Sequence, residues 1–290
     1  MEILTWCDPK YFVFARGLIG SIRYHENKNK IHLCLLDFDE DQINKVKEIY
    51  KNDSQIEYII MSSLDQKNFS VIDNNAANPD VNNGKIQFYR NFRPRLFLDL
   101  LNKSESEKIC TFGANGIVFT KLDYIDDLLD DNDFVFMERE KNNVFTDSPK
   151  TVNCIEDITK LVVEQNISID DILPQTTGKV VLLGTHAMRK SPAAVSILNR
   201  WIELIENTDS INTKFSDMNL FVKACVENQI EGTHILKKET GLEVPRSQHP
   251  FCDTSLIPGN KIWFAKGPQK FTSKLYHDTV KKFVNYKYKL

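Results

Sequence analysis

The strongest constraint on the fold is the alternation of strands and helices in the first sixty residues. Apolar runs at 3–7, 31–38 and 56–61 have the length of strands, and two segments with helical periodicity separate them. The run at 31–38 is apolar almost throughout, which indicates a strand buried on both faces. This order predicts a parallel sheet with right-handed crossovers.

The predicted helices begin with recognisable capping residues. Asp8-Pro9 directly follows the first strand and predicts a helix with Asp at the N-cap and Pro at the first position. Asp39 followed by Gln42 is a capping-box pattern. Ser191 and Ser216 each precede a further apolar-periodic segment, so each is expected to start a helix.

The remainder of the chain extends the same alternation. A helix is expected from about residue 93, and the region 167–171 reads either as a helix or as an insertion. Residues 65–85 are polar and are expected to form a surface excursion. No linker is evident, so residues 1–290 are predicted to form one mixed α/β domain. Further strands are expected at 109–112, 133–140, 179–184 and 262–265.

Composition excludes several classes of protein. The 290 residues are 41% hydrophobic and 27% charged, as in globular domains, and the net charge of −3 argues against a general nucleic-acid binder. The sequence shows neither an apolar run of transmembrane length nor a signal peptide. Six cysteines without a CxxC pair favour a reduced, cytoplasmic protein without a cysteine metal cluster. The basic tail at 281–290 is either a solvated helix end or a weak membrane-surface contact.

A glycine-flanked turn marks the candidate site. The stretch ICTFGANGIVF reads as a buried strand, the uncharged turn Gly113-Ala114-Asn115-Gly116 and a second apolar run. Ligands of open α/β sheets bind at such strand ends, and the first strand ends comparably at Cys7-Asp8. The dinucleotide-binding G-x-G-x-x-G, the P-loop and the hydrolase G-x-S-x-G motifs are all missing from the sequence.

Several segments, in order, resemble the GT-A nucleotide-sugar glycosyltransferases, closest to the glycogenin-like family 8. They span most of the chain: LTWCDPKYFVFARGLIGSI, FYRNFRPRLFLDLL, ICTFGANGIVFTKLDYIDDLL, VVLLGTHAMRKSPAAVSILNRW, FSDMNLF and IWFAKGPQK. The resemblance implies a GT-A-like, Rossmann-like fold with a mixed, mostly parallel sheet. It divides the chain into a nucleotide-binding part of about residues 1–125 and an acceptor-side part of about 126–290. The implied reaction is transfer of a sugar from a nucleoside diphosphate sugar, UDP-linked, to a hydroxyl of a glycan or other acceptor, with retention of configuration.

The sequence departs from this family where the family binds a metal. The Asp-x-Asp motif aligns with Gly113-Ala114-Asn115, and the metal-binding histidine of the last motif aligns with Phe264. Mn²⁺ and Mg²⁺ require oxygen ligands, mainly carboxylates, beside the diphosphate. The family therefore implies a divalent cation whose ligands this chain lacks, so no cofactor is assigned and a metal-independent site is expected.

The resemblance also implies which side chains form the site. Asp217 matches a sugar-binding carboxylate and Lys270 a phosphate-contacting lysine, and both are the candidate catalytic residues. His186 is the candidate acceptor contact. Arginines at 90, 93 and 95 cluster just before the turn, where cationic side chains would offset diphosphate charge. The candidate nucleotide-sugar-binding residues are Thr5, Cys7, Asp8, Tyr11, Arg90, Arg95, Gly113, Ala114, Asn115, Lys266 and Gly267.

Each of these residue types also has a purely structural explanation. Asp8 is equally suited to capping a helix, and Asn115 to a left-handed turn position. Arg95 is as consistent with a surface salt bridge, Asp217 with a favourable helix-dipole position, and His186 with an ordinary loop.

Two other functions compete with glycosyl transfer. One is a catalytically inactive protein of the same fold that binds nucleotide sugars or glycans, which the lost carboxylates favour. The other is an unrelated α/β enzyme. A nucleotidyltransferase would need carboxylates for Mg²⁺ at these strand ends, and a methyltransferase would need a glycine-rich loop after the first strand.

Overall fold

A computed structural model describes residues 1–62, 92–138, 155–176, 181–207, 216–228, 233–236, 262–264 and 274–286. The strands are β1 (Glu2–Cys7), β2 (Ile31–Leu36), β3 (Ile56–Met61), β4 (Lys108–Phe112), β5 (Gly116–Val118), β6 (Phe134–Glu138), β7 (Val181–Arg189), β8 (Thr233–Leu236) and β9 (Ile262–Phe264). The helices are α1 (Phe12–Tyr24), α2 (Glu40–Ile49), α4 (Arg93–Lys103), α5 (Asp123–Asp131), α6 (Ile155–Gln165), α7 (Ile169–Thr176), α8 (Pro192–Glu206), α9 (Ser216–Glu227) and α11 (Lys274–Val284).

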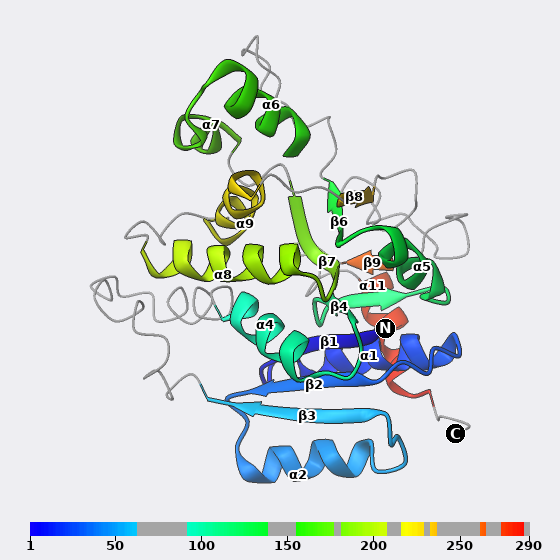
Figure 1. Cartoon of the computed structure of the whole chain (residues 1–290). Coiled ribbons are helices and arrows are strands. Elements are labelled where there is room, and N and C mark those ends of the chain that lie inside the picture. The colour runs from blue at the N-terminus through cyan, green and yellow to red at the C-terminus, as the bar shows by residue number, and fades with distance from the viewer. Residues whose placement is uncertain are drawn as a thin grey trace.

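Among the described residues, seven strands form one sheet in the order β3-β2-β1-β4-β7-β6-β8. The strands β3, β2, β1 and β4 pair with one another in parallel, as the strand–helix alternation predicts. β7 is antiparallel to both β4 and β6, and β6 is parallel to β8. The sheet is therefore mixed and mostly parallel, and it joins strands from both of the expected parts of the chain (Figure 1).

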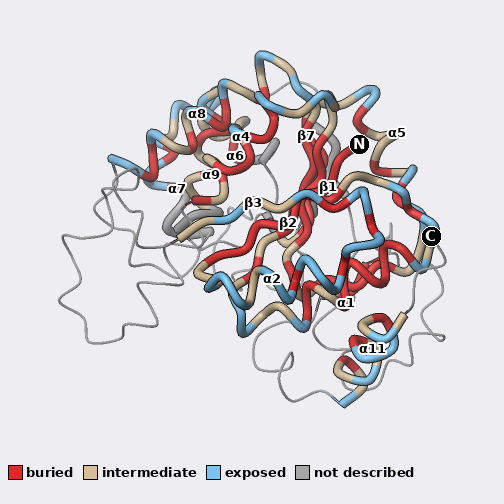
Figure 2. Tube along the Cα trace, turned by 90° about the horizontal axis from the view of Figure 1, so that it is seen from below, coloured by how far each residue is buried: buried red, intermediate tan, exposed pale blue. Residues whose placement is uncertain are grey.

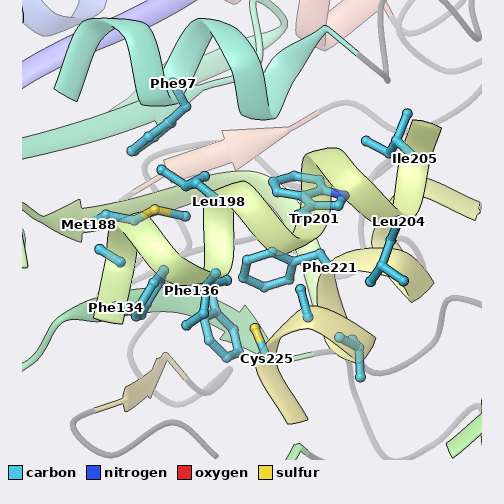
Figure 3. Close-up of a cluster of buried hydrophobic side chains, with 14 of the residues drawn as sticks. Phe97, Phe134, Phe136, Met188, Leu198, Trp201, Leu204, Ile205, Phe221 and Cys225 are labelled. Carbon is cyan, nitrogen blue, oxygen red and sulfur yellow. The ribbon is translucent and has the colours of Figure 1, made fainter. Parts of the chain in front are cut away.

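Helices cover both faces of the sheet. Apolar residues of α1, α2 and α5 pack on one face, and residues of α4, α8 and α9 pack on the other. In the second layer the rings of Trp201 and Phe221 lie 5.0 Å apart, next to Phe136 of the sheet (Figure 3). Helices α6 and α7 stand away from the sheet beyond α9 (Figure 1). The central strands are buried almost throughout, as expected for strands covered on both faces (Figure 2).

Two of the predicted caps are confirmed atom by atom. The Asp39 carboxylate accepts from the Gln42 N–H at 2.8 Å, and the Gln42 side chain accepts from the Asp39 N–H at 3.1 Å. This is the reciprocal bonding of a capping box. The Ser191 hydroxyl accepts from the Ala194 N–H at 3.1 Å and starts α8.

Two predicted boundaries are wrong for local reasons. The first helix begins at Phe12 rather than at Asp8-Pro9, because the carbonyl and the carboxylate of Asp8 both accept from the Tyr11 N–H, at 3.0 and 2.9 Å. These bonds close a separate turn before the helix. The second strand ends at Leu36 because Asp37 adopts a left-handed backbone with φ 56°.

Of the two alternatives for the region 167–171, a helix or an insertion, the helix is confirmed, because α7 begins at Ile169. The polar excursion expected at 65–85 lies outside the described residues. In the part of the chain that the structure describes, no helix has the length and apolar character needed to cross a bilayer.

Candidate functional site

The candidate site lies where β1 and β4 end side by side. These strands are parallel neighbours, with Leu4 opposite Thr111. The loop that begins at Asp8 and the turn that begins at Gly113 therefore leave the sheet from the same edge. This is the edge at which α/β sheets bind ligands.

The turn itself is held by main-chain hydrogen bonds. Gly113 N–H donates to the Gly184 carbonyl at 2.8 Å, and Gly116 N–H donates to the Gly113 carbonyl at 2.9 Å. Asn115 is not among the non-glycine residues with positive φ, so its left-handed alternative is wrong. Its carbonyl instead accepts from the Tyr276 hydroxyl at 2.8 Å. Ala114 is buried beneath the turn and belongs to the core on the α1 face.

A short second sheet brings the last motif to this turn. β5 and β9 are antiparallel, with Gly116 opposite Phe264 and Ile117 opposite Trp263. The position that aligns with the metal-binding histidine is thus paired with the residue that closes the Gly-Ala-Asn turn. Two stretches that lie far apart in the sequence therefore meet in space, as a common site requires.

The side chains at these positions do not fit a divalent cation. Gly113 and Ala114 offer no ligand atom, and Phe264 is a hydrocarbon side chain. Asn115 has only a neutral carbonyl oxygen, whereas Mg²⁺ and Mn²⁺ favour carboxylates. Within the described ranges no group of three or more His, Cys, Asp or Glu residues is placed to hold a metal ion.

Thr5 and Cys7 lie beneath the site with their side chains buried. The Thr5 hydroxyl has no hydrogen-bond partner among the described residues. Burial raises the pKa of the Cys7 thiol well above its ordinary value, and nearby Cys34 and Asp8 add to this rise. The thiol is therefore neutral and unsuited to nucleophilic chemistry. Direct contact of either buried side chain with a donor stays a prediction.

Asp8 and Tyr11 occupy the loop after β1 and are half-buried. The Asp8 carboxylate accepts from the Tyr11 N–H, and the Tyr11 ring meets the Phe14 ring edge-on at 5.7 Å. The alternative role of Asp8 as a helix N-cap is therefore wrong, because its carboxylate closes the turn before α1 and Tyr11 occupies the N-cap position. Both side chains retain an exposed fraction at the ligand-binding edge.

The two described arginines of the cluster have different surroundings. Arg95 forms an ion pair with Glu206 of α8, as its structural alternative predicts. The Arg93 guanidinium lies over the Trp6 ring, 5.4 Å from its centroid, and Trp6 directly precedes Cys7. Arg93 belongs to the arginine cluster but is not among the site residues that the sequence predicts. Its spacing from the turn did not distinguish it, since the contact with Trp6 depends on the docking of α4.

His186 does not reach the surface. Its side chain is 1% exposed, and its Nδ1 lies 2.7 Å from the Thr111 hydroxyl oxygen on the paired strand. The Phe97 ring stacks on the imidazole at 5.4 Å between centroids. The expected strand ends near residue 184, but β7 continues to Arg189, which places His186 inside the sheet. This arrangement does not support direct contact between His186 and an acceptor.

The remaining expected site residues fall outside this description. Arg90, Lys266, Gly267 and Lys270 lie outside the described residues. Asp217 lies in the first turn of α9, in agreement with the predicted helix start, but the structure does not describe its side chain. Their roles stay predictions.

Two shallow hollows lie elsewhere on the described surface. One, of about 420 Å³, lies between α8 and α9 beside Arg200 and Glu227. The other, of about 330 Å³, lies beside Asn27 and Lys121. Neither contains an expected site residue. In the first, the Arg200 guanidinium is already bonded to Glu227 at 2.6 Å and to Glu203 at 2.7 Å.

Comparison with solved structures identifies the architecture. The chain superposes over 100% of its length on 98% of the galactosyltransferase LgtC, solved with donor and acceptor sugar analogues, with a TM-score of 0.60 and 13% identity. It matches the glycosyltransferase GlyE of Streptococcus pneumoniae over 99% of this chain and 60% of that one, with a TM-score of 0.57 and 12% identity. The bifunctional glycosyltransferase WbbM matches over 98% of this chain, with a TM-score of 0.55 and 12% identity.

The chain thus has the GT-A fold of these glycosyltransferases. It spans half the length of WbbM and three fifths of GlyE. No protein-family profile and no curated protein sequence matches the chain.

Proposed function

We propose that this protein is a glycosyltransferase that moves a sugar from a UDP-linked donor to a hydroxyl acceptor without a divalent cation. The observation that carries the proposal is the pairing of Gly116 with Phe264 within a full-length GT-A fold. It joins the two stretches that the family uses beside the diphosphate. The acceptor is proposed to be a glycan or another hydroxyl compound, not a nucleic acid.

In the proposed reaction the acceptor oxygen bonds to the anomeric carbon while the bond from that carbon to the diphosphate breaks. The acceptor proton passes to the departing diphosphate, and the configuration is retained. A front-face reaction of this kind requires no dedicated general base. Asp217 is proposed to hold the sugar, and Lys270 and Lys266 to stabilise the leaving diphosphate. Preorganised cations in a dry site can supply the stabilisation that a metal otherwise provides.

The arginines have distinct parts in this proposal. Arg93 lies against Trp6 at the end of β1, so it is a proposed diphosphate contact in addition to Arg90. Arg95 is engaged by Glu206, so it would have to exchange this carboxylate for the donor. Both arginines belong to α4, which packs through Leu96 and Phe97 onto the sheet and so fixes their position.

A second candidate is a catalytically inactive nucleotide-sugar or glycan-binding protein. The specific observation in its favour is the joint loss of all three metal-ligating side chains at the turn and at position 264. The same site would bind a donor without turnover. A cytoplasmic location is proposed for either function, because the four cysteines among the described residues are buried free thiols.

The test is calorimetric titration with UDP and a panel of nucleotide sugars, in Mn²⁺ and again in EDTA. Equal affinity in both buffers and sugar transfer from the tightest donor support the proposal. Equal affinity without transfer to any acceptor or to water supports the inactive candidate. Binding that requires Mn²⁺ contradicts the metal-free site. No binding in either buffer contradicts the glycosyltransferase and leaves a glycan-binding protein of the same fold.

Arg93→Gln tests the proposed contact within the same titration. Lys103→Gln is the matched control, because Lys103 is an exposed cation at the other end of the same helix, paired with Asp99 at 2.8 Å. Loss of a charge-assisted phosphate contact is expected to weaken UDP binding by about tenfold, with the control unchanged.

A further inference from the structure

The C-terminal helix reaches the candidate site through one buried side chain. Tyr276 of α11 has an exposed fraction of 0%, and its hydroxyl donates to the Asn115 carbonyl at 2.8 Å. This contact joins the turn to a residue 161 positions later in the sequence. Burial raises the pKa of the Tyr276 hydroxyl, with Tyr11 adding to the rise, so the group keeps its proton and remains a donor at neutral pH.

Aromatic neighbours from two other parts of the site fix the Tyr276 ring. The Phe14 ring lies 5.8 Å away, and Phe14 belongs to the first turn of α1, directly after the Asp8–Tyr11 turn. The Trp263 ring lies 5.4 Å away edge-on, and Trp263 belongs to β9 beside Phe264. Tyr276 is thus the point at which α1, the Gly-Ala-Asn turn and β9 meet.

Close packing of two helices determines where α11 lies. At Gly20 of α1 an added Cβ would lie 2.2 Å from the Phe283 carbonyl oxygen, so the two backbones approach too closely for any side chain there. Val280 and Phe283 pack with Tyr276 in one apolar cluster. α11 runs alongside α1 on the side of that helix away from the sheet (Figure 2). The position of the Tyr276 hydroxyl is therefore determined by the docking of the whole helix.

We propose that Tyr276 is a positioning residue that fixes the main chain of the Gly113–Gly116 turn for the donor. In a metal-binding site the cation ties the turn to its ligand, whereas here the side chains for such a cation are absent. The hydrogen bond from Tyr276 supplies an anchor from the protein itself. This inference rests on the proposed function for its effect on donor binding, but the effect on the turn does not depend on it.

Tyr276→Phe tests the inference, because it removes the hydroxyl and leaves the packed ring. Tyr24→Phe is the matched control: Tyr24 also lies at the α1–α11 contact, with its ring 5.5 Å from that of Phe283, but it is 43% exposed and belongs to the far end of α1. Two quantities are measured at a temperature where all variants are folded. They are the hydrogen-exchange rate of the Gly116 amide and the dissociation constant for UDP.

Faster exchange of the Gly116 amide by about tenfold in Tyr276→Phe, with sheet amides unchanged and the control like wild type, would support the inference. UDP binding is expected to weaken in the same variant only. Unchanged exchange and unchanged affinity would overturn it, and so would a uniform rise in exchange across the chain, which indicates a general stabilising role. If wild type binds no UDP, the proposed function fails, and the exchange rate still decides whether Tyr276 holds the turn.

Discussion

The carbonyl of Phe283 occupies the space that a side chain on Gly20 would need. The distance from an added Cβ to that oxygen would be 2.2 Å, and to the Phe283 carbonyl carbon 2.9 Å. At Gly17, one turn earlier, the nearest atom is a methyl carbon of Val280 at 3.0 Å. The two glycines of α1 therefore face α11 with different tolerance for a methyl group.

Gly20→Ala is expected to destabilise the protein by about 1–3 kcal/mol, because overpacking against main chain forces the helices apart. Gly17→Ala is the control, since the Val280 side chain can move and alanine favours a helix by up to about 1 kcal/mol over glycine. Urea denaturation of both variants checks the prediction. Equal stability of the two variants would mean that α11 does not dock as described.

A buried carboxylate at the start of β1 predicts a pH-dependent contribution to stability. Burial alone would raise the pKa of Glu2, but hydrogen bonds from Ser104 at 2.7 Å and from His32 at 2.6 Å outweigh it, so the pKa lies below its ordinary 4.5. Lys30 also lowers it. Because the pKa of Glu2 is lowered in the folded state, the ionised Glu2 stabilises the folded protein above pH 4.5. This stabilisation is lost as the pH falls through the folded-state pKa.

Glu2→Gln is therefore expected to cost about 1–3 kcal/mol at pH 7. The difference from wild type should shrink between pH 4.5 and more acid conditions, as measured by urea unfolding at a series of pH values. Glu57→Gln is the control, because Glu57 also faces His32, at 3.3 Å, but is half-exposed. A difference in the free energy of unfolding between Glu2→Gln and wild type that stays constant down to pH 3 would contradict the lowered pKa of Glu2.

The predictions that hold are those determined by neighbouring residues in the sequence. The Asp39–Gln42 capping box and the Ser191 cap depend on bonds within one helical turn, so their residue types suffice. The first helix start was wrong because Asp8 closes a turn of its own with Tyr11, a choice the dipeptide Asp8-Pro9 does not distinguish.

Features that depend on distant contacts were not predictable from local patterns. The antiparallel insertion of β7 buries His186 against Thr111 and Phe97, and neither partner is near it in sequence. No sequence motif marks Tyr276, because its contact with the turn depends on the docking of α11 on α1. The family resemblance implied that the turn and position 264 lie close together, because the family binds one metal ion with residues from both segments. Local sequence patterns contain no such long-range information.

Arg23 and Asp53 form a buried ion pair that lysine cannot reproduce. Arg23 donates to the Asp53 carboxylate through Nε at 2.8 Å and Nη2 at 3.3 Å, and through Nη1 to the Asn27 carbonyl at 2.8 Å. Arg23→Lys replaces this planar fork with one ammonium group. We expect a loss of about 2 kcal/mol or more in the free energy of unfolding, because a buried charge loses part of its pairing.

Arg189→Lys is the control for this change. Arg189 also donates to a carboxylate, through Nη2 at 2.9 Å and Nε at 3.3 Å to one oxygen of Asp133, but its side chain is 34% exposed. Water compensates for the lost contacts there, so its cost should stay within about 1 kcal/mol. Similar losses in both variants would show that burial does not determine the strength of the Arg23 pair.

The pairing of Gly116 with Phe264 predicts that a metal site can be restored. Gly113→Asp, Asn115→Asp and Phe264→His together would place two carboxylates and an imidazole around the turn, the ligand types that Mn²⁺ accepts. The triple variant is expected to bind Mn²⁺ at least about tenfold more tightly than wild type, and its affinity for UDP should become sensitive to EDTA. Calorimetry of Mn²⁺ and UDP binding checks both, with Asn115→Asp alone as the control that lacks a complete ligand set. A folded triple variant without Mn²⁺ binding would show that these positions do not converge on one site.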